Sequence, residues 1–260
     1  MPAAQPFSLW LDTIPRPGWL NMAIDSALLE RAEAGERWLR LYAWDPPCLS
    51  FGRHEPAARR YDAARIEALG LAVVRRPTGG RAVWHARELT YAVAAPCEGL
   101  GTLREAYDAI HRVLRDALRL LGAPAELAPS RTTTPIDAGA CFAAAAGGEV
   151  LIGGRKVVGS AQLRRGKALL QHGSVLLEDD QATVLRVSLG TTASDGSAPL
   201  SRVLGRAVGW DDAARSVAEA AGRRWAMSDV VAPDAVVERA LALADRFRSP
   251  EWTWAGGPGR

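Results

Sequence analysis

The sequence predicts an α+β (mixed α/β) fold, with a mixed, largely antiparallel β-sheet and flanking helices. Strand-like runs dominate the middle of the 260-residue chain, and helical patterns stand before and after them. The chain lacks the strict strand-helix alternation that is typical of a parallel, doubly wound sheet. No period of about 20 to 50 residues indicates a repeat architecture. We therefore expect the helices to pack on one side of the sheet.

Composition is that of an ordinary globular protein. Apolar residues make up 48% of the chain and charged residues 23%. No apolar run reaches the roughly 18 residues that would span a bilayer, and no basic start followed by a long apolar stretch indicates a secretory leader. We expect a cytoplasmic protein without a membrane partner, built as a single domain over residues 1–260 with a helical C-terminal portion at about 205–250.

The charge balance is mildly positive. Lys and Arg number 32 and Asp and Glu number 29, which gives a formal net charge of +3. Arginines are spread along the chain rather than grouped, which favours an acidic or carboxylate-bearing partner over a nucleic acid. The three cysteines, Cys48, Cys97 and Cys141, are too few and too scattered for a disulfide framework or a CxxC metal site. No metal is therefore expected.

The N-terminal half reads as a series of short elements. Asn21, the only asparagine, is expected to cap an amphipathic helix over residues 22–33. Two strand-like runs follow, 38–44 and 48–52, separated by a proline turn at 45–47. This half also contains a predicted helix over 61–69 and predicted strands over 71–76, 81–84 and 89–95.

The C-terminal half combines one long helix, a strand meander and further helices. Thr102 is expected to cap an amphipathic helix over residues 103–121. Residues 129–139 are rich in Ser, Thr, Pro and Gly, so we expect a loop that leads to Cys141. The predicted meander has strands at 150–152, 156–163 and 168–177, and helical patterns return at 180–188, 211–225 and 234–247.

A glycine pair lies between two predicted strands, in the segment Arg75-Arg76-Pro77-Thr78-Gly79-Gly80-Arg81-Ala82-Val83-Trp84-His85. Glycines let backbone N–H groups approach a ligand closely, and the arginines and the histidine supply charge for a phosphate or carboxylate. A plain β-hairpin turn with exposed arginines is the alternative. The segment matches neither G-x-x-x-x-G-K-[ST] nor G-x-G-x-x-G, so it predicts neither a P-loop nor a dinucleotide fold.

Only two of the 32 cationic residues are lysines, and one of them, Lys156, lies in a polar, glycine-rich cluster over residues 153–162. A chain that uses arginine almost everywhere has a reason to keep a lysine where a compact point charge is needed. Lys156, Ser160 and Gln162 would share one strand face, with small Gly159 and Ala161 leaving room for a ligand. The alternative is a lysine retained by chance.

These segments, with Asn21-Met22-Ala23-Ile24-Asp25 and a hairpin over residues 44–53, resemble the lipoate-protein ligase and octanoyltransferase superfamily, which also includes the biotin protein ligases. The motifs occur in the expected order from about residue 10 to 180. The resemblance implies a tunnel for an eight-carbon acyl chain, bounded by the Arg-Arg-x-Thr-Gly-Gly loop. It also implies these substrate-binding residues: Arg75, Arg76, Thr78, Gly79, Gly80, Arg81, His85, Gly159, Ser160, Ala161, Gln162, His172 and Gly173.

Within that superfamily, the chain resembles the cysteine-dependent octanoyltransferases at Ala140-Cys141-Phe142, at Arg81 to His85 and at Glu88-Leu89-Thr90-Tyr91. The resemblance implies that Cys141 takes an octanoyl group from acyl carrier protein as a thioester. It implies that the acyl group then passes to a lysine of a lipoyl domain or glycine cleavage H protein. Lys156, fifteen residues after Cys141, would be the second catalytic residue. No cofactor would be required, and no separate C-terminal accessory domain is expected.

Two other functions remain open at the level of sequence. An ATP-dependent lipoate-protein ligase, which uses ATP and magnesium and acts through lipoyl-AMP with or without a separate accessory subunit, shares most of these motifs. A non-catalytic module that binds an acylated partner is the other, but it gives no reason to keep both Cys141 and Lys156. Cys48 and Cys97 stand in apolar, strand-like segments and are expected to be inert.

Overall fold

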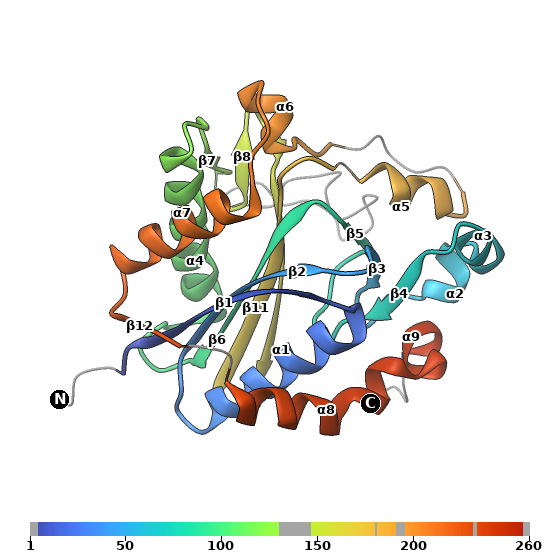
Figure 1. Cartoon of the computed structure of the whole chain (residues 1–260), viewed down its shortest axis with the longest axis horizontal. Coiled ribbons are helices and arrows are strands. Elements are labelled where there is room, and N and C mark those ends of the chain that lie inside the picture. The colour runs from blue at the N-terminus through green and yellow to red at the C-terminus, as the bar shows by residue number, and fades with distance from the viewer. Residues whose placement is uncertain (1–4, 130–146, 180, 191–195, 231–232, 257–260) are drawn as a thin grey trace.

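A six-stranded sheet forms the centre of the protein (Figure 1). The computed structural model describes residues 5–129, 147–179, 181–190, 196–230 and 233–256. The strand order is β10–β11–β6–β2–β1–β12. Its strands are β1 (Phe7–Arg16), β2 (Trp38–Trp44), β6 (Glu88–Pro96), β10 (Val158–Arg165), β11 (Ala168–Leu176) and β12 (Met227–Asp229). β1 pairs in parallel with β2 and β12, and the other neighbours are antiparallel, which confirms the predicted mixed sheet.

Two small sheets flank the large one. The first has the order β4–β3–β5, and its strands are β3 (Cys48–Phe51), β4 (Ala72–Arg75) and β5 (Val83–His85). The second has the order β7–β8–β9, and its strands are β7 (Glu126–Leu127), β8 (Val150–Ile152) and β9 (Arg155–Lys156). The predicted strand over 156–163 is thus split between β9 and β10.

The hairpin expected over residues 44–53 is wrong. β2 and β3 belong to different sheets, because the proline turn at 45–47 carries the chain from the large sheet to the small one. The hairpin alternative for the glycine segment is wrong as well. β4 pairs with one side of β3 and β5 with the other, so the segment over 76–82 crosses the end of β3.

Helices cover both faces of the large sheet, so the expected packing on one side is wrong. α4 (Leu103–Leu120) and α7 (Trp210–Gly222) pack on one face, and α1 (Gly18–Glu33) and α8 (Asp234–Arg248) on the other (Figure 1). The reason is visible in β6, where Tyr91 and Val93 face one core while Ala92 and Ala94 face the other. A sheet that is apolar on both faces needs a helix layer on each.

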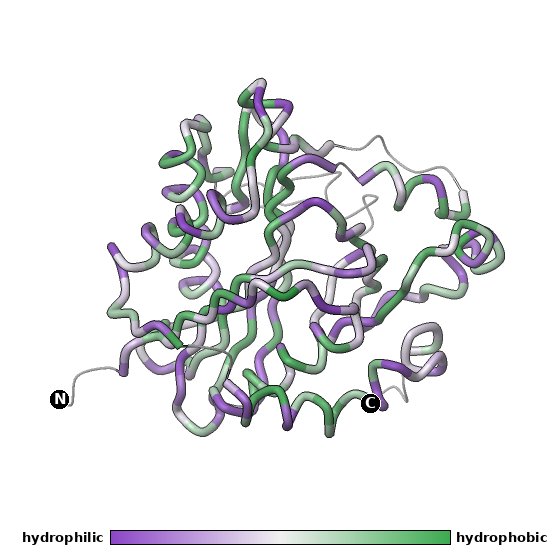
Figure 2. The backbone as a smooth tube through the Cα atoms, viewed as in Figure 1, coloured by the Kyte–Doolittle hydropathy of each residue, from purple (hydrophilic) through white to green (hydrophobic). Residues whose placement is uncertain are grey.

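Hydropathy follows this layering. Green and purple alternate along α7 and α8 in Figure 2, as expected for helices that bury one face. α4 begins at a capping box in which Thr102 accepts from the Glu105 N–H and Glu105 accepts from the Thr102 N–H, which confirms the predicted cap. The shorter helices are α2 (Ala57–Arg60), α3 (Ala63–Ala68), α5 (Ala182–Val187), α6 (Leu200–Leu204) and α9 (Pro250–Ala255). Within the described residues, none of the helices is long and apolar enough to cross a membrane.

Asn21 is not the cap of its helix, which corrects the sequence prediction. α1 begins at Gly18 with Pro17 in the cap position, so Asn21 lies inside the first turns, fully buried. Its Nδ2 donates to the carbonyl oxygens of Arg16 and Ala43, at 3.2 and 3.1 Å, and its Oδ1 accepts from Arg40 Nη2 at 2.7 Å. The side chain therefore ties α1 to β1 and β2.

Asn21→Ala is expected to lower the free energy of unfolding by about 2 to 3 kcal/mol, because it leaves buried donors and acceptors without partners. Thr102→Ala removes a true helix cap and is expected to cost only about 1 kcal/mol. Urea unfolding of both variants measures the difference. Equal, small losses would mean that Asn21 contributes no more than a cap.

Candidate functional site

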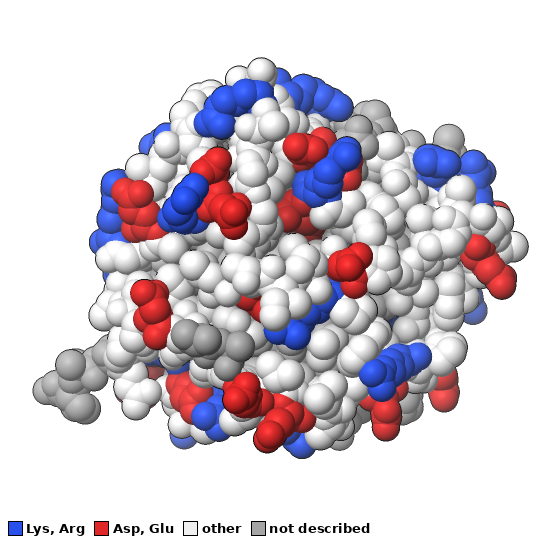
Figure 3. Space-filling view, in the orientation of Figure 1, with Lys and Arg blue, Asp and Glu red and all other residues white. Residues whose placement is uncertain are grey.

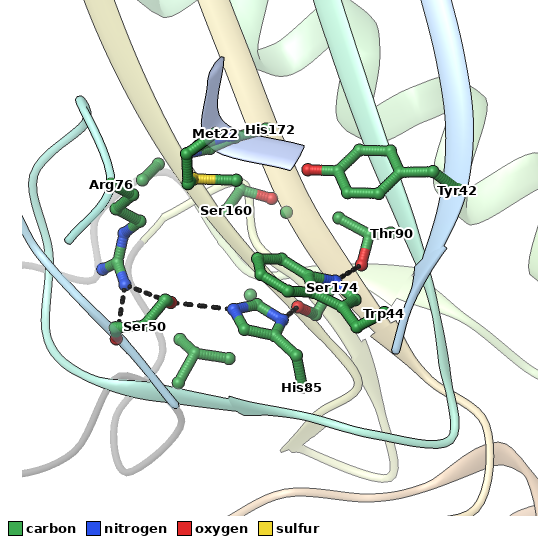
Figure 4. Close-up of a pocket in the computed structure, with 14 residues that line it drawn as sticks. Met22, Tyr42, Trp44, Ser50, Arg76, His85, Thr90, Ser160, His172 and Ser174 are labelled. Carbon is green, nitrogen blue, oxygen red and sulfur yellow. Dashed lines mark hydrogen bonds between the residues drawn. The ribbon is translucent and has the colours of Figure 1, made fainter. Parts of the chain in front are cut away.

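A pocket lies between α1, the large sheet and the small sheet of β3, β4 and β5 (Figure 4). The space between its lining atoms, open side included, is about 350 Å³. The lining residues are Met22, Tyr42, Trp44, Ser50, Arg76, Val83, His85, Thr90, Gly159, Ser160, Ala161, His172, Gly173 and Ser174. Residues far apart in the sequence thus meet at one site.

Most residues predicted to bind substrate lie in or beside this pocket. Those that line it are Arg76, His85, Gly159, Ser160, Ala161, His172 and Gly173. Thr78 lies one contact away, because its Oγ1 is 2.6 Å from His172 Nε2. Gln162 does not line the pocket, and its Nε2 donates to Gln171 Oε1 at 2.8 Å and to the Leu103 carbonyl at 3.0 Å. Gly79, Gly80 and Arg81 belong to the loop that surrounds the Arg76 side chain.

The glycine loop is held by its own backbone and by Arg76. The Arg76 guanidinium donates to the carbonyl oxygens of Gly79 and Arg81, at 2.9 and 2.6 Å, and to Ser50 Oγ at 2.9 Å. Gly52 approaches the Gly80 carbonyl so closely that a Cβ on Gly52 would collide with it. Gly80 adopts a φ of 91°, which favours glycine. The loop therefore fixes the side chain of Arg76, which lines the pocket.

Arg75 is placed differently from the prediction. Its side chain is fully buried and points away from the pocket. It donates to the carbonyl oxygens of Trp252 and Thr253 in α9, at 2.8 and 3.0 Å, and to that of Glu55 at 2.8 Å. This guanidinium joins α9 to the turn after β3, and its donors are directed to backbone rather than to a ligand.

His85 belongs to a buried chain of hydrogen bonds at one wall. Its Nδ1 lies 2.7 Å from Glu88 Oε1, and its Nε2 lies 2.8 Å from Ser50 Oγ. Because Ser50 Oγ accepts from Arg76, the Ser50 proton is left to donate to Nε2. The imidazole stacks on Trp44 with ring centroids 4.0 Å apart. Its ring plane and hydrogen-bond roles are thus fixed (Figure 4).

His172 has the same kind of partners at the opposite wall. Its Nδ1 is 2.7 Å from Asp25 Oδ2, and its Nε2 faces the Thr78 hydroxyl. Burial lowers the pKa of His172 below its ordinary value, against the opposing effect of Asp25. A neutral imidazole that donates to Asp25 leaves Nε2 as the acceptor for Thr78. The predicted loop residue Thr78 is therefore anchored to α1 through one imidazole.

His111 on α4 is a third buried histidine at the site. Its Nδ1 donates to the carbonyl of Gly148 at 2.7 Å, so its Nε2 accepts from Ser160 Oγ at 2.8 Å. Burial lowers the pKa of His111 to about 3, and the Lys156 charge acts in the same direction. Ser160 Oγ also lies 2.6 Å from the Tyr91 hydroxyl. The pocket hydroxyl of Ser160 is thus fixed from two sides.

Lys156 does not stand as an isolated charge. Its Nζ donates to Glu149 Oε1 at 2.6 Å, and the two side chains are only 4% and 8% exposed. Lys156 and the pocket residue Ser160 lie on consecutive strands, β9 and β10. The lysine that the sequence singled out is therefore half of a buried ion pair.

Of the three cysteines, the structure describes Cys48 and Cys97, which differ in burial. Cys141, the predicted nucleophile, lies outside the described residues. Cys48 is fully buried on β3, and burial raises the pKa of its thiol well above the ordinary value. Cys97 is partly buried and packs against the hydrophobic core to which α4 contributes. The buried thiol of Cys48 has the properties of the inert residue that the sequence predicts.

The arrangement suits an apolar ligand. Ser50, Thr78 and Ser160 each direct their hydroxyl toward a histidine nitrogen, so their polar atoms are already bonded when an apolar chain enters. Met22, Trp44 and Val83 supply apolar surface. Arg76 is the cation that lines the pocket, and its guanidinium is held by the loop.

Several site residues were not singled out from sequence. Ser50, His111 and Glu149 carry hydrogen bonds of the site but were not named as candidate residues. Glu88 stands in the Glu88-Leu89-Thr90-Tyr91 motif, but its contact with His85 was not expected. One signal was available for His111, which is a polar residue inside the apolar stripe of the predicted helix over 103–121. Ser50 meets His85 because β3 pairs with β5, and Glu149 meets Lys156 because β8 pairs with β9.

The sequence of the chain is similar to that of a known protein family. The family described as lipoyl protein ligase A/B catalytic domain matches residues 17–222. The octanoyltransferase LipM of Carboxydothermus hydrogenoformans is 42% identical over 183 residues, 68% of this chain and 68% of the relative. The octanoyltransferase LipM of Symbiobacterium thermophilum is 39% identical over 247 residues, which cover 88% of this chain and 89% of the relative.

Solved structures share the fold. A lipoate-protein ligase A bound with ATP superposes with a TM-score of 0.79 at 18% identity, over 96% of this chain and 99% of that one. A putative lipoate protein ligase from T. acidophilum with bound lipoic acid gives a TM-score of 0.79 at 19% identity, with the same coverage. These likenesses confirm the lipoate ligase catalytic fold.

Arg75→Lys is expected to lower the free energy of unfolding by about 3 kcal/mol, because an ammonium cannot reach the carbonyl groups that the guanidinium bonds on both α9 and the turn after β3. Arg112→Lys, at an exposed position of α4, is the matched control and should change stability little. Urea unfolding measures both. A small loss of unfolding free energy in Arg75→Lys would show that these hydrogen bonds contribute little to stability.

Stability should fall as the pH is lowered from about 6.5 toward the folded-state pKa of His111 at about 3. In that pH window His111 and His172 bind a proton in the unfolded chain but stay neutral in the folded protein. The free energy of unfolding therefore falls by up to about 1.4 kcal/mol per pH unit for each histidine. Unfolding at pH 7, 6 and 5 measures the slope. His111→Gln should reduce it, whereas a change at the exposed His54 should not. Parallel pH curves for wild type and His111→Gln would contradict this assignment.

Proposed function

This chain belongs to the lipoyl protein ligase A/B catalytic domain family, and we propose how it carries out its reaction, octanoyl transfer in lipoate biosynthesis. A relative that is 39% identical over 88% of the chain is an octanoyltransferase, and this observation carries the functional conclusion. As an octanoyltransferase, the protein moves an acyl group from a donor to a lipoyl-domain acceptor. The route of the acyl group and the identity of the donor are the parts that we propose.

The proposed route runs through Cys141. Acyl carrier protein delivers the octanoyl group, Cys141 takes it as a thioester, and a lysine of a lipoyl domain or glycine cleavage H protein receives it. The support is the Ala140-Cys141-Phe142 motif and its spacing of fifteen residues from Lys156. The raised pKa of the buried Cys48 thiol argues against Cys48 as the nucleophile.

The two steps balance without a further reagent. The Cys141 thiolate attacks the donor carbonyl, the donor C–S bond breaks, and the donor thiol leaves with the proton that Cys141 lost. The neutral amine of the acceptor lysine then attacks octanoyl-Cys141, forms an amide, and returns its proton to the Cys141 sulfur. Thioester exchange is close to isoenergetic and amide formation is downhill, so ATP and magnesium are not required.

The pocket provides the acyl site in this proposal. The octanoyl chain would lie against Met22, Trp44 and Val83, between walls fixed by His85 and His172. Glycine is required at position 173 of the pocket lining, because a Cβ there would collide with the Gly159 carbonyl on the neighbouring strand β10. The chemical groups of octanoate require no hydrogen-bond partner beyond its carbonyl, which matches a lining whose hydroxyls are already bonded.

Lys156 would stabilise negative charge that develops on the thioester oxygen or on the Cys141 sulfur. Deletion of a comparable hydrogen-bond donor costs roughly 2.7 to 4 kcal/mol in other acyl-transfer enzymes.

An acyl donor carried by acyl carrier protein also implies a cytoplasmic enzyme in this proposal. The visible face in Figure 3 carries interspersed acidic and basic side chains, and we assign no docking surface for the donor to it.

Intact-mass spectrometry tests the route. Octanoyl carrier protein alone is expected to add one octanoyl group, which hydroxylamine removes because it is a thioester. Cys141→Ala is expected to abolish the adduct, whereas Cys97→Ala, at a partly buried cysteine outside the pocket, should retain it. A label on Cys48 or Cys97 would refute the assignment of Cys141.

Addition of ATP separates this route from the ligase alternative. In the cysteine route, ATP and magnesium should not accelerate transfer, and free octanoate or lipoate should be a poor donor. An ATP-dependent lipoate-protein ligase would release one AMP for each acceptor modified, and it would remain active as Cys141→Ala. AMP release measured from labelled ATP decides between the two reactions.

A further inference from the structure

The C-terminal helix α9 packs against β4, the strand that leads into the glycine loop over residues 76–82 (Figure 1). The helix stands after residues 17–222, the part of the chain that the family match covers. It is nevertheless part of the folded core, because its Trp252 side chain is buried. Its hydrogen bonds to β4 are made to Arg75, the residue directly before Arg76 of the pocket. α9 therefore stands close to a side chain that lines the site.

We propose that α9 positions the glycine loop, and with it the Arg76 side chain, for binding of the acyl ligand. The proposal rests on the proposed function, because that function supplies the octanoyl group that occupies the pocket. Arg75 and Trp252 make the bonds between α9 and β4, and neither of them lines the pocket. They act through Arg76 and are therefore positioning residues.

α9 and Arg75 are bonded in both directions. Arg75 Nε donates to the carbonyl oxygens of Trp252 and Thr253, at 2.8 and 3.0 Å, and its Nη2 donates to that of Trp254 at 3.2 Å. In return, Trp252 Nε1 donates to the Arg75 carbonyl at 3.0 Å. The carbonyl groups in the last turn of a helix have no partner inside the helix, and a cation there is favourable. The guanidinium of Arg75 therefore supplies the partners that the end of α9 needs.

The same guanidinium holds the turn after β3. Its Nη1 donates to the carbonyl oxygens of Arg53 and Glu55, at 3.1 and 2.8 Å, and also to that of Gly52. A guanidinium presents its N–H groups in one rigid plane, so the two sets of acceptors cannot move independently of each other. The position of α9 is thus coupled to the position of this turn.

The turn after β3 contacts the glycine loop directly. The Arg53 N–H donates to the Thr78 carbonyl at 2.7 Å. A Cβ on Gly52 would lie 1.9 Å from the Gly80 carbonyl oxygen, so no space separates the two backbones. The loop in turn holds Arg76, whose Nη2 donates to two loop carbonyl groups. A displacement of the turn would therefore be transmitted to the guanidinium that lines the pocket.

Loss of α9 would leave Arg75 with buried donors that have no acceptor. Among the described residues, Nε and Nη2 of Arg75 donate only to carbonyl groups of α9. An unsatisfied buried donor is costly, so the side chain would move toward water and the turn after β3 would move with it. The loop would then hold Arg76 in place for only a fraction of the time. The apparent affinity for the ligand falls by that fraction.

Truncation after Ser249 tests the whole contact. The truncated protein is expected to show a KM for octanoyl carrier protein that is raised about tenfold, as follows if about a tenth of the molecules keep the loop in place. The rate at saturating donor should stay within about twofold of the wild type, because ligand binding restores the bound arrangement. An unchanged KM overturns the inference.

Trp252→Phe tests the single indole bond and keeps the helix. It removes the donor to the Arg75 carbonyl, so it is expected to raise the same KM about fivefold. Trp254→Phe is the matched control, because it makes the same exchange two residues away and its indole nitrogen has no hydrogen-bond partner among the described residues. It should leave the KM unchanged. Equal effects of the two substitutions overturn the inference.

Hydrogen exchange gives a measurement that does not depend on the reaction. The Arg53 N–H donates to Thr78, and the Arg76 N–H donates to the Phe51 carbonyl at 3.0 Å. Peptides that contain these two amides are expected to exchange at least tenfold faster in the truncated protein, while those of β10 and β11 keep their wild-type rates. If the truncated protein does not fold, Trp252→Phe against Trp254→Phe provides the same comparison.

The exchange rates also separate this inference from the proposed function. Unchanged exchange at Arg53 and Arg76 overturns the inference, whatever the activity. Equally faster exchange in β10 and β11 overturns it as well, because α9 would then support the whole fold rather than the loop. A wild-type protein that transfers no octanoyl group counts against the proposed function alone, and the exchange rates then decide the inference.

Discussion

The buried guanidinium of Arg40 is the group on which the core and the pocket both depend. Arg40 on β2 donates to Asp12 of β1 at 2.7 Å and to Asp25 of α1 at 3.1 Å. Arg16 also pairs with Asp12, so two cations face two carboxylates in this cluster. Removal of a charge from water is costly unless partners surround it. α1, β1 and β2 must therefore adopt the one arrangement that satisfies all four groups.

The same cluster reaches the pocket through Asp25. One carboxylate oxygen binds Arg40, while the other accepts from Tyr42 and His172, which in turn fixes Thr78 of the glycine loop. A chain of short contacts thus runs from the centre of the sheet to the pocket wall. The loop owes its position to this chain as much as to its glycines, because Gly79 and Gly80 allow many conformations and the bonded Thr78 restricts them.

The buried histidines His85, His111 and His172 follow one pattern. In each, Nδ1 faces an oxygen of a carboxylate or carbonyl and Nε2 faces a hydroxyl at the pocket. None of these imidazole nitrogens is left to act on a ligand directly. The histidines hold the wall in place, and an apolar chain meets polar atoms that are already satisfied. In the proposed route the reactive groups are Cys141 and Lys156 rather than these histidines.

The sequence predicted well what local patterns determine. The helix cap at Thr102 and the hairpin of β10 and β11 both depend on neighbours in the chain. The meander predicted over 150–177 is divided, because β8 and β9 belong to a different sheet from β10 and β11. It failed where tertiary contacts decide. Asparagine is a common helix-cap residue, but the buried Asn21 side chain instead bonds to the backbone at the ends of β1 and β2. Ten-residue β1 was missed, because its outer half is polar and the strand is recognised only once β2 and β12 pair with it.

Arg75 and Arg76 show the same limit most clearly. They are adjacent and chemically identical, yet one bonds α9 and the other lines the pocket. Consecutive residues of an extended segment point to opposite sides, so one of the pair must face away from any site. Which one does so depends on α9, about 177 residues further along the chain. No pattern near residue 75 contains that information.

The scarcity of lysine in this chain is consistent with the proposed route. On the proposed route the enzyme carries an acyl thioester, and any neutral amine of its own that reaches the thioester would compete with the acceptor. Of its 32 cationic side chains, only Lys156 and Lys167 carry an amine, because the others are arginines, whose guanidinium keeps its proton. One is paired with a carboxylate and the other lies at a turn away from the pocket. Arginine thus supplies positive charge without supplying a competing nucleophile.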